Sequence, residues 1–208
     1  MAKRRYDNRV RAERAQQTRT RLLEATTALL VEEGVEALSI PKVAQRADVS
    51  APTAYKNFPT LEDLLLAHLE HVRPQLGLSA AYLAEVNPET VVPMASANCR
   101  RFERHGALVR AVLDSSVFQR VRKDSRKDRP SMFEAGFSGI APRLRARDRT
   151  AALGATFIFL TPTPWRWLRD TWGLSARDTA KAVAWAVSVL LRELASDPTS
   201  IDPVAHDG

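Results

Sequence analysis

The residues best suited to chemistry lie between Ser39 and Phe58, where small, polar and cationic side chains follow one another. If this stretch forms two short helices, the exposed face of the second presents Ala51, Thr53, Tyr55 and Lys56. Such side chains suit the major groove of DNA: small groups pack near thymine methyls, hydroxyls form hydrogen bonds, and a cation meets acceptors or phosphates. A two-helix hairpin with no role in DNA binding fits the same pattern, so the spacing alone leaves both interpretations open.

Local signals predict the helices that would position these side chains. Apolar residues at helical spacing predict a first helix over 15–33, ended by Gly34. A second helix is expected over 40–47, with Ser39 as its N-cap and Pro41 in its first turn. After a short turn, Ser50 is expected to cap a third helix that begins at Ala51 and stops at Phe58-Pro59. Together these segments predict a helix-turn-helix over 39–58.

Charge is concentrated at the N-terminus. The chain has a net charge of +7, and residues 1–21 hold eight basic side chains against two acidic ones. Basic arms of this kind often contact DNA phosphates, because each neutralised phosphate releases condensed counterions. A solvated tail that aids solubility is the other interpretation.

The rest of the chain also carries helix signals, and sustained alternation typical of strands is absent. Thr60 and Asp63 form a capping pair for a fourth helix. Further helices are expected over 87–105, 107–114, 116–145 and 148–160, the last of these ended by Thr161–Pro164. Ser175 and Asp178 are expected to cap a final helix. The fold class is therefore predicted as all-α, with a domain boundary near Leu76.

The final helix is apolar around most of its circumference, because only Lys181 and Ser188 are polar between Ala180 and Leu191. A helix of this kind must be covered on more than one side. A second copy of the chain is the favoured cover, and complete enclosure in the chain's own core is the alternative. The expected dimer interface comprises Val183, Trp185, Val187, Leu190, Leu191 and Leu194.

A resemblance to a known family extends this interpretation over residues 16–76. The residues that carry it are Leu22–Ala25, Gly34–Ile40, Val43–Ser50, Tyr55–Pro59 and Glu62–Leu64. At this spacing they closely resemble the TetR family of bacterial transcriptional regulators. The resemblance implies about nine helices in an N-terminal three-helix DNA-binding domain (16–76, after a basic arm, 1–15) and a ligand-binding and dimerisation domain (77–208).

The resemblance also implies a homodimer whose recognition helices enter successive major grooves of a palindromic operator. Three positions depart from the family pattern: Asp48 replaces the usual turn glycine, Pro41 occupies a frequent base-contacting position, and Leu61 replaces a frequent lysine. Aspartate tolerates a left-handed backbone better than most residues, so the turn is expected to form. The DNA-binding positions carried over or added on these grounds are Ser39, Lys42, Ser50, Ala51, Pro52, Thr53, Tyr55, Lys56 and Asn57, with Arg4 and Arg5 of the arm.

Aromatic and flexible side chains of the second domain are candidates to line an apolar ligand cavity, although core packing also explains each of them singly. The proposed lining residues are Met94, Phe102, Phe118, Phe133, Phe137, Phe157, Trp165 and Trp167. The expected function is therefore a repressor that a small, largely apolar molecule releases from its operator. A constitutive DNA-binding regulator without a ligand is the alternative.

An enzyme is the rival class, and the sequence gives it little support. His68 and His71 are three residues apart but lack further ligands at metal-binding spacing, so they are interpreted as surface or domain-interface histidines. Glycine-rich phosphate loops and nucleophile motifs are absent. Cys99 is interpreted as a buried packing thiol. We therefore expect no cofactor, no metal and, with no apolar stretch long enough to span a bilayer, a cytoplasmic protein.

Overall fold

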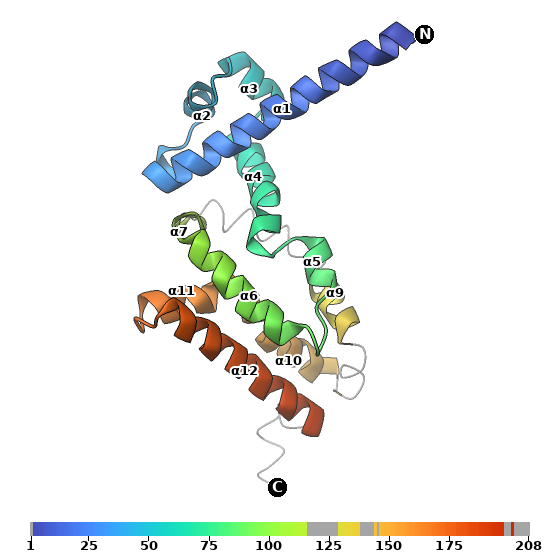
Figure 1. Cartoon of the computed structure of the whole chain (residues 1–208), viewed down its shortest axis with the longest axis vertical. Helices are drawn as coiled ribbons and strands as arrows, with labels where there is room; N and C mark the ends of the chain where they lie inside the picture. Colours follow the sequence, from blue (N-terminus) through green and yellow to red (C-terminus); the bar gives the residue numbers. More distant parts are fainter. Residues whose placement is uncertain (1, 116–128, 138–143, 145, 198–200, 202–208) are drawn as a thin grey trace. The chain divides into compact units, whose positions relative to one another are not determined.

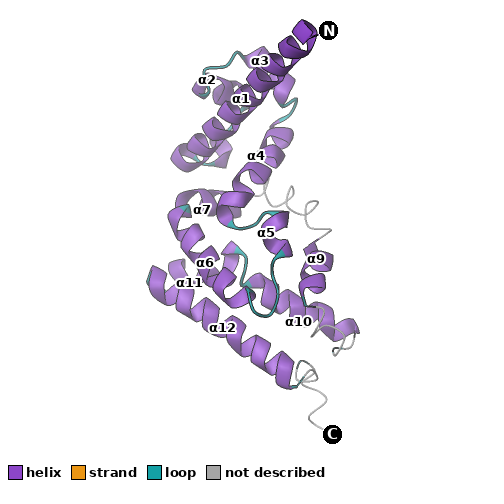
Figure 2. Cartoon of the chain, turned by 45° about the vertical axis from the view of Figure 1, so that its right-hand side comes forward, coloured by secondary structure: helices purple, strands orange, loops and turns teal. Residues whose placement is uncertain are grey.

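The computed structural model describes residues 2–115, 129–137, 144, 146–197 and 201, and in this part of the chain every regular element is a helix (Figure 2). The predicted all-α class is confirmed. Eleven α-helices occur among the described residues, more than the nine expected, because short helices interrupt the second domain. Within the same residues, no helix is long and apolar enough to cross a membrane.

The chain divides into two compact units. Unit 1 contains residues 2–72 and 110–115, and unit 2 contains residues 73–109 and the described residues from 129 onward (Figure 1). The helices that start before residue 80 are α1 (Ala2–Glu33), α2 (Ile40–Arg46), α3 (Ala51–Asn57) and α4 (Leu61–Leu76), with a 3-10 turn at Val35–Ala37. The later helices are α5 (Ala80–Ala84), α6 (Val91–Arg104), α7 (Gly106–Asp114), α9 (Arg129–Gly136), α10 (Ala146–Ile158), α11 (Pro162–Asp170) and α12 (Ala176–Ser196).

The core of unit 1 forms around one stripe of α1. Leu22, Leu29 and Leu30 on this stripe are at most 3% exposed. Val43 in α2 and Phe58 directly after α3 are buried as well, and α2 lies against both α1 and α3. Because an amphipathic helix buries its apolar face only by packing on its neighbours, this core fixes α2 and α3 in place.

Helix α1 begins at Ala2, well before the expected start at Ala15. The preceding segment, residues 2–14, contains no glycine or proline and holds five arginines, one lysine and two alanines. Arginine, lysine and alanine are strong helix formers, so the backbone continues as a helix without an apolar stripe. The prediction depended on that stripe, which starts only at Leu22, and it therefore placed the start of the helix too late. The basic arm is part of α1.

Two of the predicted capping pairs are confirmed. The backbone N–H of Asp63 donates to Thr60 Oγ1 at 3.1 Å, and the carboxylate of Asp63 accepts in return from the Thr60 N–H at 3.1 Å. At α12, the Asp178 N–H donates to Ser175 Oγ at 3.1 Å. Each pair satisfies a backbone donor that the helix itself leaves unpaired.

Helix α11 is not predicted by the sequence, because Thr161–Pro164 reads only as the end of the preceding helix. Thr161 is extended (φ −91°, ψ 162°), and Pro162 then occupies the first turn, where its missing N–H costs nothing. The same prolines thus end one helix and begin the next. Helix α5 is a further addition. The helix expected over 116–145 lies largely outside the described residues, and α9 falls within it.

In unit 2, α6 and α12 lie side by side and α11 packs against both (Figure 1). Phe102 and Trp165 face each other in this core, with ring centroids 6.1 Å apart. Trp165 Nε1 and Arg169 Nε donate to Glu103 Oε2 at 3.0 and 3.1 Å, and Arg169 Nη2 donates to Oε1 at 2.9 Å. Both oxygens of this half-buried carboxylate are therefore engaged by α11.

A buried amide fixes the turn that follows α4. Asn98 of α6 donates to the backbone oxygens of Leu160 (2.9 Å) and Gly77 (3.4 Å), and its Oδ1 accepts from Arg101 at 3.0 Å. Gly77 has φ +67°, and a Cβ at this position would lie 2.3 Å from Asn98 Oδ1. Both the backbone conformation and the close approach of the amide therefore require glycine here.

His68 in α4 is not a surface histidine, because its side chain is fully buried. The ring shares a hydrogen bond with α1, where His68 Nε2 lies 2.9 Å from Thr27 Oγ1. Burial, with a smaller contribution from the charge of His71, lowers the pKa of His68 from 6.5 to about 4. The folded protein thus keeps His68 neutral at pH values where the unfolded chain protonates it.

The stability of the protein should therefore depend on His68 below neutral pH. Between about pH 6.5 and pH 4 the unfolded state binds more protons, so the free energy of unfolding falls as pH falls through this window. We expect a loss of about 2 kcal/mol between pH 7 and pH 5. Urea unfolding followed by circular dichroism at both pH values measures it. His68→Gln should remove most of this loss and His71→Gln should keep it; the reverse order would contradict the assignment.

Candidate nucleic-acid interface

Helices α2 and α3 form the predicted helix-turn-helix. Ser39 caps α2, since its Oγ accepts from the Lys42 N–H at 3.4 Å, and Pro41 lies in the first turn as expected. Ala54 on α3 is 1% exposed, so this face of the helix is closely packed. The turn is closed by a backbone hydrogen bond of 2.9 Å from Val49 N to the oxygen of Ala44. The remaining face of α3 is thereby held outward.

Asp48 gives the turn its direction. Its φ of 51° is in the left-handed region, and no other non-glycine residue of the described chain has a positive φ. Arg21 of α1 ties this turn down, because its Nη2 donates to the backbone oxygens of Ala47 (2.5 Å) and Asp48 (2.8 Å). The expectation that the turn forms despite the missing glycine agrees with this geometry.

The outward face of α3 carries the side chains expected there. Pro52, Thr53, Tyr55 and Lys56 are exposed, with Tyr55 at 46%, while Ala51 is half-buried. The phenol of Tyr55 and the ammonium group of Lys56 therefore point outward from a helix whose opposite side is packed in the core. This combination can reach base edges and phosphates in a groove.

Other predicted contacts are already engaged within the chain. Ser50 occupies the N-cap position of α3 as predicted, but its Oγ accepts no backbone N–H of the helix and instead shares a hydrogen bond of 2.8 Å with Thr53 Oγ1. Asn57 Nδ2 donates to the Thr53 oxygen of its own helix at 2.8 Å. The Ser50 hydroxyl and the Asn57 amide thus support α3 in the absence of DNA.

The end of α1 neutralises two cations of α2. Lys42 Nζ lies 2.5 Å from Glu33 Oε2, and Arg46 forms two hydrogen bonds with the carboxylate of Glu32, at 2.5 and 2.9 Å. Exposed pairs of this kind contribute little to stability and exchange readily. Lys42 would have to leave Glu33 to contact a phosphate, whereas Lys56 has no acidic partner within the described residues.

Two arginines of α1 were not predicted as parts of the site. Arg19 lies over the ring of Phe58, 4.4 Å from its centroid, and donates to the Asn57 oxygen at 3.3 Å. It thus holds the end of α3, whereas Arg21 holds the turn that precedes α3. Both follow the basic arm in the sequence, and their partners lie 38 and 27 residues away, so no local signal could reveal their role.

The basic segment before Ala15 is an extension of the helix that supports the turn before α3. Arg4 and Arg5 lie on the helical backbone of α1, but their side chains are outside the described part of the structure. Arg11 and Arg14, further along the same helix, are exposed. One helix thus carries both the cations of the arm and the arginines that hold α3.

The candidate ligand-lining residues divide into packed and exposed groups. Phe133 contacts both Phe137 and Phe157, with centroids 4.7 and 5.2 Å apart. Trp167 is 61% exposed and therefore does not line the interior, whereas Trp165 is 1% exposed. Of the others, Phe102 is fully buried, Met94 is half-buried, and Phe118 lies outside the described residues.

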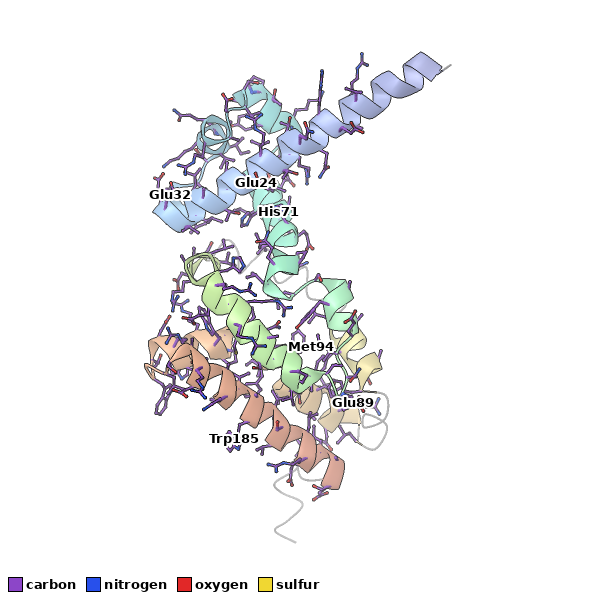
Figure 3. All side chains as sticks on the ribbon, in the orientation of Figure 1. Glu24, Glu32, His71, Glu89, Met94 and Trp185 are labelled. Atoms are coloured by element: carbon purple, nitrogen blue, oxygen red, sulfur yellow. The ribbon has the colours of Figure 1, made fainter. Side chains whose placement is uncertain are left out.

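The residues expected at the dimer interface also divide. Val183, Val187 and Leu194 are at most 5% exposed within a single chain, so they belong to its own core and are not available to a partner. Trp185 is 68% exposed and projects from the side of α12 away from α6 (Figure 3). Leu190 and Leu191 are half-buried. One part of the apolar circumference of α12 therefore packs in the chain's own core, and another part is exposed.

Cys99 is buried in α6, as expected for a packing thiol. Burial raises the pKa of this thiol to about 11. The reactive form of a cysteine is the thiolate, so Cys99 is chemically inert at neutral pH.

Comparison with known proteins gives the same class as this geometry. Residues 22–68 match the family described as "Bacterial regulatory proteins, tetR family". The HTH-type transcriptional repressor KstR of Mycolicibacterium smegmatis is 33% identical over 110 residues, which cover 51% of this chain and 54% of that protein. The match thus spans about half the length of the curated relative.

Solved structures share the fold over most of the chain. A protein of Syntrophomonas wolfei described as a TetR-family transcriptional regulator aligns with a TM-score of 0.64 and 18% identity, covering 85% of this chain and 95% of the other. NalD, the secondary repressor of the MexAB-OprM multidrug efflux pump in Pseudomonas aeruginosa, gives 0.59 and 16%, covering 85% and 96%. At these identities the two structures show that this chain shares their fold. Residues 22–68, which contain the helix-turn-helix, are therefore those of the TetR family of bacterial regulators.

The turn before α3 can be tested through Asp48. Asp48→Gly should be more stable than Asp48→Ala by about 1 kcal/mol, because alanine pays the steric cost of the left-handed backbone and glycine does not. The Asp48 side chain itself is fully exposed, so its loss is common to both variants. Urea unfolding measures the difference. Equal stability of the two variants would show that the backbone at this position is not left-handed in solution.

Proposed function

We propose that this TetR-family regulator is a transcriptional repressor that binds a palindromic operator as a homodimer and is released by a small, largely apolar molecule. The observation that carries the proposal is the exposed face of α3, which is held outward by the buried opposite face, by Arg21 at the preceding turn and by Arg19 at the end of the helix. A rigid helix with an outward phenol and ammonium group is the device by which helix-turn-helix proteins enter the major groove.

We assign two roles in DNA binding to two groups of side chains. Tyr55 and Lys56 are exposed and can reach base edges, whereas Arg11 and Arg14 extend along α1 beyond the turn and suit phosphate contacts. Arg4 and Arg5 continue the same basic segment. Pro41 offers no polar side chain, so readout is assigned mainly to α3. Ser39, Lys42, Ala51 and Pro52 are then supporting contacts at the start of the two helices.

We infer a homodimer from large aromatic side chains that are exposed on unit 2. Trp167, Trp172 and Trp185 are between 61% and 69% exposed, and they belong to α11, the segment after it, and α12, which pack together. Large exposed aromatic side chains are costly in water and are enriched at protein interfaces. With Val183, Val187 and Leu194 committed to the core, Trp185 becomes the centre of the proposed dimer face.

The effector is proposed to enter the aromatic cluster Phe133–Phe137–Phe157. In the structure these rings pack on one another, and Phe133 and Phe137 are at most 3% exposed. An apolar ligand would therefore have to separate α9 from α10, and it can release DNA only if it binds that conformation better than the DNA-bound one. A constitutive regulator, in which this cluster is only core, is the alternative.

Selection from a random pool of DNA duplexes tests the proposal with the full chain. The bound pool should converge on an inverted repeat, and small apolar compounds that raise the melting temperature of the protein should weaken binding to that sequence. Stabilising compounds that never affect DNA binding would favour the constitutive regulator. A pool that fails to converge would overturn the proposal of sequence-specific binding.

Substitutions in α3 should change sequence preference, whereas substitutions in the basic extension of α1 should weaken binding to all DNA sequences. Lys56→Ala should weaken binding to the selected operator by roughly 1–3 kcal/mol, with a smaller effect on random duplexes, and alter site preference. Arg14→Ala, the matched control, should weaken both duplexes equally and reduce the slope of log K against log salt by about one. Fluorescence anisotropy at several salt concentrations measures both. Equal losses on both duplexes for Lys56→Ala would assign this lysine to phosphate only.

Dimerisation should depend on Trp185 and not on the buried face of α12. Trp185→Glu should yield a folded monomer in analytical ultracentrifugation, with helical circular dichroism retained, because the charge can remain in water once the subunits separate. Val187→Glu places a carboxylate in a position that is 0% exposed and should unfold unit 2. The monomer should also lose most operator affinity, since two half-sites are no longer held together. A wild-type protein that is monomeric at micromolar concentration would exclude this face as an interface.

A further inference from the structure

A groove of about 530 Å³ lies on unit 2 between α6 and α12. Its α12 side includes Ala176, Ala180 and Ala184, which recur every four residues and therefore lie on one face of that helix. These small side chains leave open space between the two helices and give the groove an apolar lining. The residues proposed for DNA binding, for the effector and for the dimer lie elsewhere.

Cations line this α6–α12 groove from both helices. Arg100 and Arg104 come from α6, and Arg177 and Lys181 come from α12; all four are exposed. Glu103 is the single acidic lining residue, and both of its carboxylate oxygens already accept hydrogen bonds from α11. No acidic side chain of the described chain lies within ion-pair distance of the four cations. The groove therefore has a strong, uncompensated positive charge.

The placement of these cations is unfavourable unless an anion binds between them. Arg100 and Arg104 are four residues apart on α6, and Arg177 and Lys181 are four apart on α12, which sets like charges side by side on each helix. Arg100 is also oriented, because its Nη1 donates to Ser96 Oγ at 3.0 Å, and Ser96 lines the groove too. An anionic group at each helix would remove both repulsions.

We propose that the α6–α12 groove binds a small organic dianion, with two carboxylate or phosphate groups joined by a short apolar chain. One acidic group meets Arg100 and Arg104, the other meets Arg177 and Lys181, and the apolar chain lies along the alanines between them. Guanidinium groups bind carboxylate and phosphate through paired hydrogen bonds, and the volume is that of a small-molecule site. This site is separate from the apolar effector site and does not depend on DNA binding.

Isothermal titration of the full chain with adipate tests the proposal at low salt. Adipate should bind, hexanoate should bind at least tenfold more weakly because it reaches one helix only, and hexane-1,6-diol should not bind. A parallel titration with hexane-1,6-diol bisphosphate distinguishes a phosphate ligand from a carboxylate ligand. Added salt should weaken each anion, since exposed charges are screened.

Variants separate the groove from general attraction by a basic protein. Arg100→Gln and Lys181→Gln, one on each helix, should each weaken adipate binding at least fivefold. Arg192→Gln is the matched control, an exposed cation of α12 that does not line the groove, and should leave binding within twofold. Ala184→Leu, which fills the groove and keeps every charge, should weaken adipate more than inorganic phosphate.

Several outcomes would overturn the proposal. Absence of saturable binding of both dianions in the millimolar range, or equal loss in Arg192→Gln, would leave only non-specific attraction. Dissociation of a wild-type dimer by Arg100→Gln or Lys181→Gln would make the groove an interface between copies. A loss of DNA affinity in these variants, with no dianion bound, would make it a surface for duplex phosphates.

Discussion

The direction of α3 depends on one left-handed residue and on the arginine that holds it. Asp48 turns the chain between α2 and α3, and Arg21 of α1 donates to the backbone oxygens of Ala47 and Asp48 at the start of that turn. Arg19 repeats the arrangement at the other end of α3, over Phe58. The same helix that carries the basic extension therefore also positions the turn before α3 and the end of α3.

Ion pairs within unit 1 decide where positive charge is available. Glu32 and Glu33 at the end of α1 engage Arg46 and Lys42, and an acid-base pair on the surface contributes little net attraction for DNA. Lys56 has no such partner among the described residues. Among the described residues, exposed cations include Lys56 of α3, Arg11 and Arg14 of α1 and, in unit 2, the four cations of the α6–α12 groove.

The faces of helix α12 lie in different surroundings. Val183 and Val187 face the core of unit 2, Ala180 and Ala184 line the groove beside α6, and Trp185 faces outward. A helix of this length presents residues around its whole circumference, so hydrophobicity alone does not tell which face meets the chain itself and which would meet a second copy.

The sequence by itself determined the class and the local features of this protein. The all-α fold, the helix-turn-helix over 39–58, the caps at Ser39, Thr60 and Ser175, and the first-turn proline of α2 follow from signals within four residues of one another, and these are confirmed. Local hydrogen bonds and helical periodicity are enough to specify such features.

Only the tertiary structure decided which of the candidate side chains are exposed and unpaired, and so able to contact a partner, among the described residues. Several interactions depend on a different element of the chain. Lys42 pairs with Glu33, Arg21 holds the turn, and Glu103 is engaged by Arg169. The burial of His68 and of Val187 depends on packing between helices in the same way. A side chain's type fixes what it can bond to, but its partner is chosen by packing between helices, and that choice leaves no signal in the residues around it.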